Sequence, residues 1–238
     1  MITAHRPSDT TLFKLIEQHP EVRLAETKAH PGCLTFEQDG LLRKVLVGDP
    51  TVEESGLVEL IDNNPLVCSN AVSVPGPAAT LALIALGPVI RAGLLLERPT
   101  MQYSVKLSGE NIDGFLQSAG WSGGIDVSDG DEDLGTVLAA NVIAVVETPE
   151  EWRDIDDLYD ECFGRSFYVH SLPDGEWDTK LVADKPFAVY RLRYTPGEES
   201  SLLTIQVMAD KDGKCGAAQM LHAMNVMCGF EECEGLSV

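Results

Sequence analysis

Hydrophobic residues recur with two different periods along the chain, and these periods predict mixed helices and strands. Apolar residues three or four positions apart predict helices over residues 8–19, 51–64, 78–92, 150–163 and 216–229. Shorter alternating or continuous apolar runs predict strands at 22–26, 33–38, 41–48, 100–108, 136–147, 166–172, 187–194 and 201–209. Strands that mix with helices and pair as hairpins indicate an α/β or α+β domain built around a sheet.

Local turn and cap residues place several boundaries. Ser8 and Asp9 are cap residues for the first helix, and Pro20 ends it. Asp39-Gly40 predicts a tight hairpin, because this dipeptide suits a type I′ turn. Residues 148–151, Thr-Pro-Glu-Glu, form a capping box that should start the next helix.

Three further segments carry less regular patterns. Pro88 should kink the apolar helix that Gly93 closes. Gly109 to Gly135 is rich in Gly, Ser and Asp and is expected to be mostly loop. The first eleven residues contain no glycine, and we expect almost no strand before the first helix.

The net charge of -21 on 238 residues narrows the classes of partner. Such a surface repels phosphate backbones and anionic lipids, so we expect neither nucleic acid nor a membrane surface as a partner. No apolar run reaches the roughly 20 residues of a membrane span, and the N-terminus has no apolar leader core. The six cysteines show no CxxC pairs and no metal-ligand spacing, which predicts free thiols, no metal site and a cytoplasmic protein.

Three segments resemble N-acetyl-γ-glutamyl-phosphate reductase, a member of the semialdehyde dehydrogenase superfamily. Residues 11–25 are similar to its first Rossmann helix and second strand, and residues 74–95, VPGPAATLALIALGPVIRAGLL, to its Asn-Pro-Gly-Cys motif with the following helix. The segments GTVLAANVIAVVE, FYVHSLPDGEW and DKDGKCGAAQMLHAMNVMCGFEECEGL resemble its C-terminal domain. The resemblance covers well over half of the chain.

This resemblance implies a fold and a domain division. We expect residues 1–74 to be a shortened Rossmann-like remnant, and residues 75–238 to be an α+β dimerisation domain whose last helix returns to the N-terminal part. The family reduces an acyl phosphate to a semialdehyde with NADPH, through a cysteine thioester and a histidine that moves protons. It also implies a homo-oligomer, either a dimer or a tetramer.

The chain departs from the family at the nucleophile. With Pro75 and Gly76 aligned on the motif, the family's cysteine falls on Pro77 and its asparagine on Val74; Asn70 lies four residues too early. Proline has no nucleophilic atom, so a thioester cannot form there.

The other parts of the family chemistry are missing as well. Residues 125–135 replace the family's Thr-Pro-His segment and hold no histidine, and residues 107–111 lack the arginine of its Ser-Gly-Ala-Gly-Arg turn. No glycine turn precedes the first helix, so we expect no nicotinamide cofactor, although the family uses NADP.

Two cysteines keep an enzyme hypothesis open. Cys33 ends a His-Pro-Gly-Cys stretch, which is either a relocated nucleophile or a loop before a strand. Cys215 precedes the last helix beside Lys214, and is either a partly ionised thiol or a neutral packed one.

The residues of a residual pocket are Pro75, Gly76, Pro77, Lys214 and Gln219. Lys214 and Gln219 match family positions near the active site; alternatively, Lys214 is a surface charge and Gln219 caps a helix end. The acids of residues 126–133 are either a calcium loop or a solvated acidic loop, and their spacing does not fit an EF-hand.

The sequence therefore predicts a non-catalytic homologue of these reductases that acts by binding or assembly. A small acidic metabolite in the residual pocket and an active reductase subunit are the candidate partners. The alternative is an active oxidoreductase of the family with a rearranged site.

Overall fold

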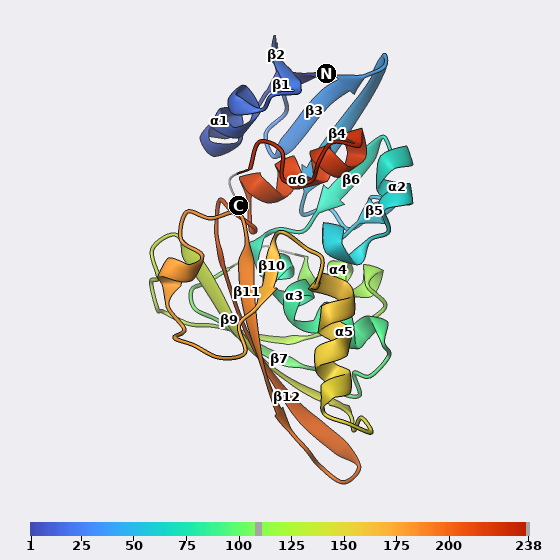
Figure 1. Cartoon of the computed structure of the whole chain (residues 1–238), viewed down its shortest axis with the longest axis vertical. Helices are drawn as coiled ribbons and strands as arrows, with labels where there is room; N and C mark the ends of the chain where they lie inside the picture. Colours follow the sequence, from blue (N-terminus) through green and yellow to red (C-terminus); the bar gives the residue numbers. More distant parts are fainter. Residues whose placement is uncertain (108–110, 237–238) are drawn as a thin grey trace.

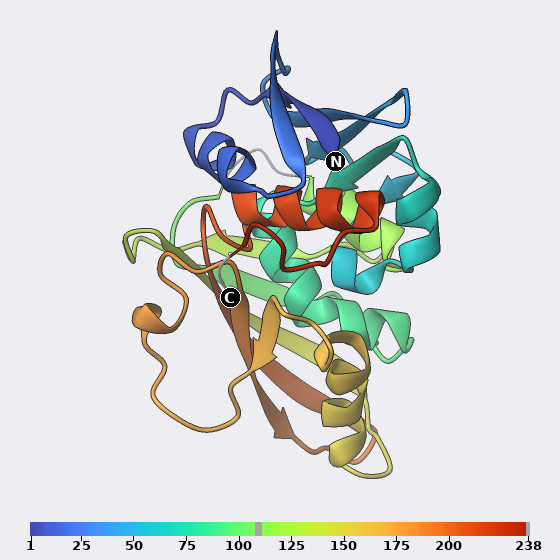
Figure 2. The same ribbon diagram turned by 45° about the horizontal axis from the view of Figure 1, so that its top comes forward.

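The computed structural model describes residues 1–107 and 111–236, and these residues form two six-stranded sheets. Figure 1 shows the first sheet at the top of the molecule and the second sheet below it, with helices between and beside them. The second view shows the last helix of the chain, in red, crossing the middle of the molecule between the two sheets (Figure 2).

The first sheet is built from the N-terminal third of the chain. Its elements are β1 (Ile2–Arg6), α1 (Thr10–Gln18), β2 (Val22–Lys28), β3 (Cys33–Gln38), β4 (Leu41–Val47), β5 (Glu54–Ser55), the 3-10 helix η1 (Val58–Leu60), α2 (Asn63–Cys68) and β6 (Ala71–Val74). The strand order is β2-β1-β3-β4-β6-β5, in which β1 and β2 are parallel and β3 is antiparallel to both β1 and β4. The β3–β4 turn confirms the predicted hairpin, because Asp39 and Gly40 both have positive φ, 53° and 80°.

The second sheet and its helices follow from residue 77 onward. Its elements are α3 (Pro77–Arg91), β7 (Thr100–Tyr103), α4 (Ile112–Ser118), β8 (Asp126–Asp129), β9 (Val137–Glu147), α5 (Arg153–Phe163), β10 (Val169–Ser171), the 3-10 helix η2 (Thr179–Leu181), β11 (Ala188–Thr195), β12 (Ser200–Asp210) and α6 (Ala217–Cys228). The strand order is β10-β11-β12-β9-β7-β8, with the long strands β9, β12 and β11 antiparallel.

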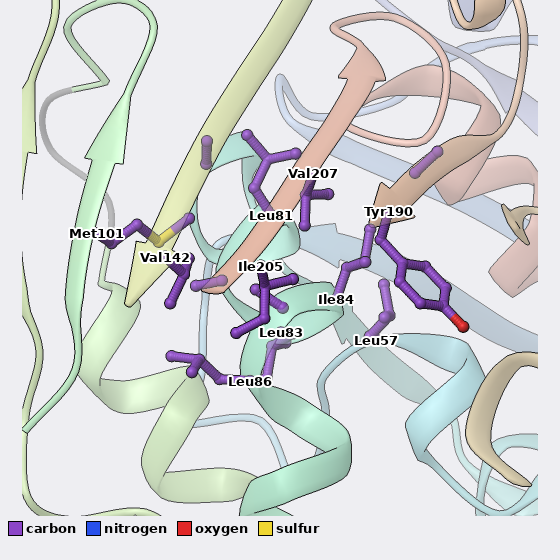
Figure 3. Packing of buried hydrophobic residues seen from close by; sticks show 14 of the residues in the cluster. Leu57, Leu81, Leu83, Ile84, Leu86, Met101, Val142, Tyr190, Ile205 and Val207 are labelled. Carbon is purple, nitrogen blue, oxygen red and sulfur yellow. The ribbon is translucent and has the colours of Figure 1, made fainter. Parts of the chain in front are cut away.

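Helix α3 forms the centre of the larger core. All of its residues from Ala78 to Ile90 are buried, because β9 and β12 pack on one side of it and α4 and α5 on others. Figure 3 shows Leu81 and Leu86 of α3 facing Val142 and Ile205 of the sheet. Each fully buried leucine of this kind stabilises the fold by about 1.5–3 kcal/mol relative to an exposed one.

Helix α6, although last in the sequence, packs on the first sheet and on α1 and α2 (Figures 1 and 2). Its C-terminal end is tied down by Arg43 of β4, which is 6% exposed. The Arg43 guanidinium donates to the carbonyl oxygen of Met227 at 2.6 Å and to those of Leu66, Val67 and Ser69. One cation therefore satisfies the terminal carbonyls of both α2 and α6, which helices leave unpaired.

The expectation of almost no strand before the first helix is wrong. Residues Ile2–Arg6 form β1, which lies between β2 and β3. Only Ile2 and Ala4 are buried apolar residues of this strand. Two apolar positions are too few to reveal a period of two, so the strand is stabilised mainly by its neighbours.

Two further segments differ from expectation. The helix predicted over 51–64 is instead β5, η1 and the start of α2, because Gly56 has a φ of 148° and interrupts it. Within the expected loop of 109–135 lie α4, which Asn111 caps by accepting from the Gly114 N–H, and β8. Residues 108–110 lie outside the described part of the chain, and the strand expected over 100–108 ends at Tyr103.

The capping box at 148–151 does not form. The Thr148 hydroxyl donates to the carbonyl of Gly197 and contacts the Ser201 hydroxyl, so it pairs with the β11–β12 turn. Helix α5 begins later, at Arg153, where Asp154 accepts from the Glu151 N–H. None of the helices in the described ranges combines the length and hydropathy that a membrane span requires.

Candidate functional site

The tight turn between β6 and α3 holds the Pro75-Gly76-Pro77 segment. Gly76 is the N-cap of α3 and Pro77 its first residue, a position where the missing proline N–H disturbs nothing. Pro75 and Gly76 are buried, whereas Pro77 is partly exposed. The Thr80 hydroxyl closes the turn by donating to the Pro75 carbonyl at 3.2 Å.

The start of α6 lies against this turn. Gln219 Nε2 donates to the Pro75 carbonyl oxygen at 2.9 Å and to the Thr80 hydroxyl at 3.2 Å. Cys215 is 2% exposed, and its Sγ lies 3.9 Å from the carbonyl oxygen of Pro77. The structure thus brings Pro75, Pro77, Cys215 and Gln219 together, and Gln219 does not cap a helix end.

The chain can approach so closely before α6 because of its glycines. A Cβ on Gly213 would lie 2.0 Å from the Lys185 carbonyl oxygen, and one on Gly216 would lie 2.2 Å from that of Lys211. Asp210, 3% exposed, anchors the same turn by accepting from the N–H groups of residues 212 and 213. No larger residue than glycine fits these two positions, so the turn fixes where α6 begins.

Lys214 is neither a surface charge nor open to a ligand. Its side chain is 1% exposed, and its Nζ lies 2.6 and 2.8 Å from the two carboxylate oxygens of Glu59. Burial opposes the charge on Glu59, but Lys214 and His222 outweigh it, so the pKa of the Glu59 carboxyl lies below its usual range. Lys214 therefore carries a buried ion pair with η1.

His222, Tyr168 and Glu232 extend this ion pair into a polar network. His222, 1% exposed, lies with Nε2 3.0 Å from a Glu232 carboxylate oxygen and with Nδ1 3.9 Å from Glu59 Oε1. The ring of Tyr168 packs against that of His222 at a tilt of 49°, with 4.4 Å between the ring centroids, and the Tyr168 hydroxyl donates to the Glu232 carbonyl. The hydrogen bond from His222 holds the pKa of Glu232 below its ordinary value, and burial raises that of Tyr168.

Sequence reasoning missed Glu59, Tyr168, His222 and Glu232. Glu59 lies 155 residues from Lys214, and nothing in the chain's local pattern links the two. His222 was visible only as one of three polar residues, with Gln219 and Asn225, in a mostly apolar helix. Polar residues within a mostly apolar helix are a local indication of a buried network.

Cys33 lies outside this group of residues. It begins β3 and hydrogen-bonds the Thr35 hydroxyl across 3.3 Å. Leu34 and Phe36 belong to the core cluster that contains α6. Because side chains alternate along a strand, Cys33 points to the opposite face of the first sheet from α6. The structure therefore supports the interpretation of Cys33 as a strand residue.

Known proteins match this chain in structure but not in sequence. No family model matches the chain, and no curated protein matches its sequence. Solved structures do match: the aspartate semialdehyde dehydrogenase II of Vibrio cholerae complexed with ASA has a TM-score of 0.62 at 10% identity, covering 95% of this chain and 98% of the other. A second structure of that enzyme gives a TM-score of 0.60 at 10% identity, with 93% and 96% covered.

The fold is that of a semialdehyde dehydrogenase. This confirms the predicted fold class, a Rossmann-like part joined to an α+β part of the semialdehyde dehydrogenase type. At 10% identity the likeness is one of fold alone. The division at residues 74 and 75 stays a prediction.

A Rossmann-like fold that binds a dinucleotide does so where its first strand ends and the next helix begins, which here is the end of β1 and the start of α1. A surface hollow of about 540 Å³ lies there, between Arg6, Asp9, Phe13 and Lys28. The Asp9 carboxylate occupies the helix start, where it accepts from the Leu12 N–H at 2.7 Å. A pyrophosphate needs a glycine turn and free N–H groups at this point, and it would meet the negative charge of Asp9. These residues do not fit the dinucleotide.

Metal ligands are not grouped either. Within residues 1–107 and 111–236, no three His, Cys, Asp or Glu side chains are arranged to hold a metal ion. Asp126 of the acidic segment pairs instead with Arg98 at 3.2 Å.

Proposed function

We propose that this chain is a non-catalytic relative of the NADP-dependent N-acetyl-γ-glutamyl-phosphate reductases and acts by binding or assembly. One observation carries the proposal: the first residue of α3, where the family motif would place a cysteine, is Pro77. A proline there can neither attack an acyl phosphate nor hold a thioester.

The neighbouring groups support the same conclusion. The Lys214 ammonium is neutralised by Glu59, and the Gln219 amide donates to the turn before α3. Asp9 takes up an N–H group at the start of α1 that a dinucleotide would otherwise use. The groups that would hold an acyl phosphate and a nicotinamide are thus engaged inside the protein.

The test is a comparison with an active N-acetyl-γ-glutamyl-phosphate reductase under the same conditions. Thermal unfolding is measured with NADPH, NADP, NAD and N-acetyl-glutamate-type ligands, and NADPH oxidation is measured with an acyl phosphate. We expect no shift with any dinucleotide and no turnover, whereas the control enzyme shows both. A dinucleotide shift or turnover at the control's rate overturns the proposal.

For assembly, we propose a homo-oligomer formed through the face of the second sheet that is turned away from α3. Ile143 of β9 is 48% exposed on this face and Leu202 of β12 39%. Their strand neighbours Val142 and Leu203 point to the α3 side and are fully buried. A cytoplasmic setting fits the six cysteines, which are thiols rather than disulfides.

Light scattering after gel filtration tests this assembly. We expect the wild type at twice the chain mass or more, and Ile143→Lys at the mass of one chain. Leu41→Lys, which changes an exposed apolar residue on the first sheet, is the matched control and should leave the mass unchanged. A monomeric wild type excludes self-assembly and leaves an active reductase subunit or a small acidic metabolite as the proposed partner.

A second candidate function rests on Cys215. Its thiol lies beside Pro77, so a sulfur atom is present near the start of α3. A reductase with a rearranged site would use this thiol as its nucleophile. Alkylation with a limiting amount of iodoacetamide, followed by peptide mass mapping, separates the two candidates. The non-catalytic proposal expects Cys215, 2% exposed, to react more slowly than the exposed Cys68. Faster reaction at Cys215 favours the enzyme.

A further inference from the structure

The carboxylate of Glu59 is held as a bound ligand would be. Lys214 Nζ contacts both of its oxygens, at 2.6 and 2.8 Å, and the Ser166 hydroxyl donates to Oε1 at 3.1 Å. A buried ammonium and a hydroxyl on one carboxylate form a charge-assisted site. None of these contacts depends on the rest of the glutamate side chain.

The groups that hold Glu59 are fixed by contacts of their own. The Ser166 hydroxyl oxygen accepts from the Tyr168 N–H at 2.9 Å, which directs its proton toward Glu59. The Tyr168 hydroxyl is bound to the Glu232 carbonyl, and the Lys214 ammonium lies 5.6 Å from the centre of the Tyr168 ring. The residues around the Glu59 carboxylate come from the segment before β10 and from the turn that leads into α6. Neither segment belongs to η1, the element that carries Glu59.

One wall of the site has spare hydrogen-bonding capacity. His222 Nδ1 is buried and has no hydrogen-bond partner among the described residues, and it lies 3.9 Å from Glu59 Oε1. A buried ring nitrogen without a partner is rare, because its desolvation is not offset. The pocket formed by Lys214, Ser166, Tyr168 and His222, called here the Lys214 pocket, therefore keeps a ring nitrogen that the Glu59 carboxylate does not use.

Glu59 reaches the Lys214 pocket from the surface. It is the middle residue of the three-residue helix η1, and its side chain is 5% exposed while the residue as a whole is partly exposed. Glu59 also lines a surface hollow of about 380 Å³ together with Arg91, Leu158 and Cys162. Shortening this side chain would therefore connect the Lys214 pocket with solvent through the hollow.

We propose that the Lys214 pocket is a binding site for small monocarboxylates, and that Glu59 is its tethered internal occupant. The site recognises a carboxylate by the Lys214 ammonium and the Ser166 hydroxyl, and η1 closes it. The inference rests on the proposed function and deepens it, because it gives a binding role to Lys214, one residue of the expected residual pocket, and names the chemical class of its ligand. Carboxylate binding by the Lys214 pocket can be measured without a dinucleotide and without turnover, so its outcome is separate from the test of the proposed function.

The experiment uses Glu59→Ala, which removes the atoms of one acetate ion. The loss leaves Lys214 buried and unpaired, and we expect the melting temperature to fall by about 6–20 °C. Sodium acetate is then added at constant ionic strength, with sodium chloride as the balancing salt. We expect a saturable rise in melting temperature with acetate, and saturation-transfer NMR from the protein to the acetate methyl group.

Three controls make the test specific. The wild type should not respond to acetate beyond chloride, because Glu59 fills the pocket. Glu59→Ala combined with Ser166→Ala should bind acetate more weakly, because one of its two partners is gone. Glu54→Ala, in the neighbouring β5, should neither lose as much stability nor respond to acetate.

Each remaining outcome decides the matter. An equal response of Glu59→Ala to acetate and chloride, with no saturation transfer, means that Glu59 and Lys214 are only a structural ion pair and overturns the proposal. If Glu59→Ala does not fold in chloride, folding in acetate supports the proposal and folding in neither salt overturns it. Either result leaves the dinucleotide test of the proposed function unaffected.

Discussion

The side-chain amide of Gln219 donates a hydrogen bond to the carbonyl of Pro75 across 2.9 Å, joining residues 144 positions apart. This contact ties the start of α6 to the Pro75-Gly76-Pro77 turn before α3. The Oε1 atom of the same amide is buried without a hydrogen-bond partner among the described residues.

This geometry predicts losses of different size for two substitutions of similar volume. Gln219→Met removes the hydrogen bonds to Pro75 and Thr80 but also the unpaired oxygen, and should lower the free energy of unfolding by only about 1–3 kcal/mol. Gln219→Glu buries a carboxylate against the Pro75 carbonyl oxygen and should cost about 3–5 kcal/mol at neutral pH. Urea unfolding of both variants measures the difference. Equal losses would mean that the amide contact does not determine the packing here.

Pro77→Cys restores a thiol at the first position of α3. The start of a helix lowers the pKa of a thiol, so we expect rapid alkylation of the new cysteine. We expect no NADPH-dependent turnover, because the Asp9 carboxylate still occupies the start of α1. Peptide mapping and NADPH oxidation are the measurements. Both the wild type and Pro77→Cys also carry Cys215→Ser, which removes the neighbouring thiol. Turnover in this variant would show that Pro77 alone prevents catalysis and that the rest of the active site is functional.

Asp9 is a helix cap in this structure. Asp9→Ala should lower the free energy of unfolding by about 1 kcal/mol, since the Leu12 N–H loses its acceptor, and Asp9→Ser should restore most of the loss. Thermal unfolding with and without NADPH checks both variants. A dinucleotide shift that appears in Asp9→Ala would identify Asp9 as the group that excludes the cofactor.

His19 makes stability depend on pH. Burial lowers its pKa from 6.5, although the hydrogen bond with Asn225 works against this shift. Its Nδ1 accepts from the Glu21 N–H, and its Nε2 lies 3.1 Å from Asn225 Oδ1, so the folded protein favours the neutral ring. The unfolded chain then binds the proton more readily, and stability should rise with pH between about pH 5 and 7.

The measurement for His19 is urea unfolding at several pH values in the wild type and in His19→Gln. The glutamine amide can still donate to Asn225 but does not titrate, so its slope should be shallower over this range. The proton-linked interpretation fails if the two slopes coincide.

Local sequence patterns predicted most of the helices and strands correctly. The β3–β4 hairpin was predictable because Asp39-Gly40 specifies its own turn, and β9 and β12 were predictable because their apolar runs are long. The errors lie in short elements. Residues 2–6 become a strand only because β2 and β3 pair with them, and Gly56 interrupts the helix expected over 51–64.

The candidate site was predictable only in part. The proline at residue 77 and the proximity of residues 75–77 to the last helix followed from the sequence through a family resemblance. The hydrogen bond of Thr148 with a distant turn and the ion pair of Lys214 with Glu59 could not be predicted from the sequence. A polar side chain bonds with whichever partner the fold brings within about 3 Å.

The sequence by itself determined where most strands and helices lie and that Pro77 carries no nucleophile, because periodicity and side-chain chemistry are local properties. Only the tertiary structure decided what Lys214, Gln219 and His222 do. The partners of Lys214 and Gln219, which are Glu59 and Pro75, come from the first third of the chain and reach the start of α6 only when it packs on the first sheet. A buried charge must find its counter-charge in three dimensions, and sequence separation places no limit on where that partner comes from.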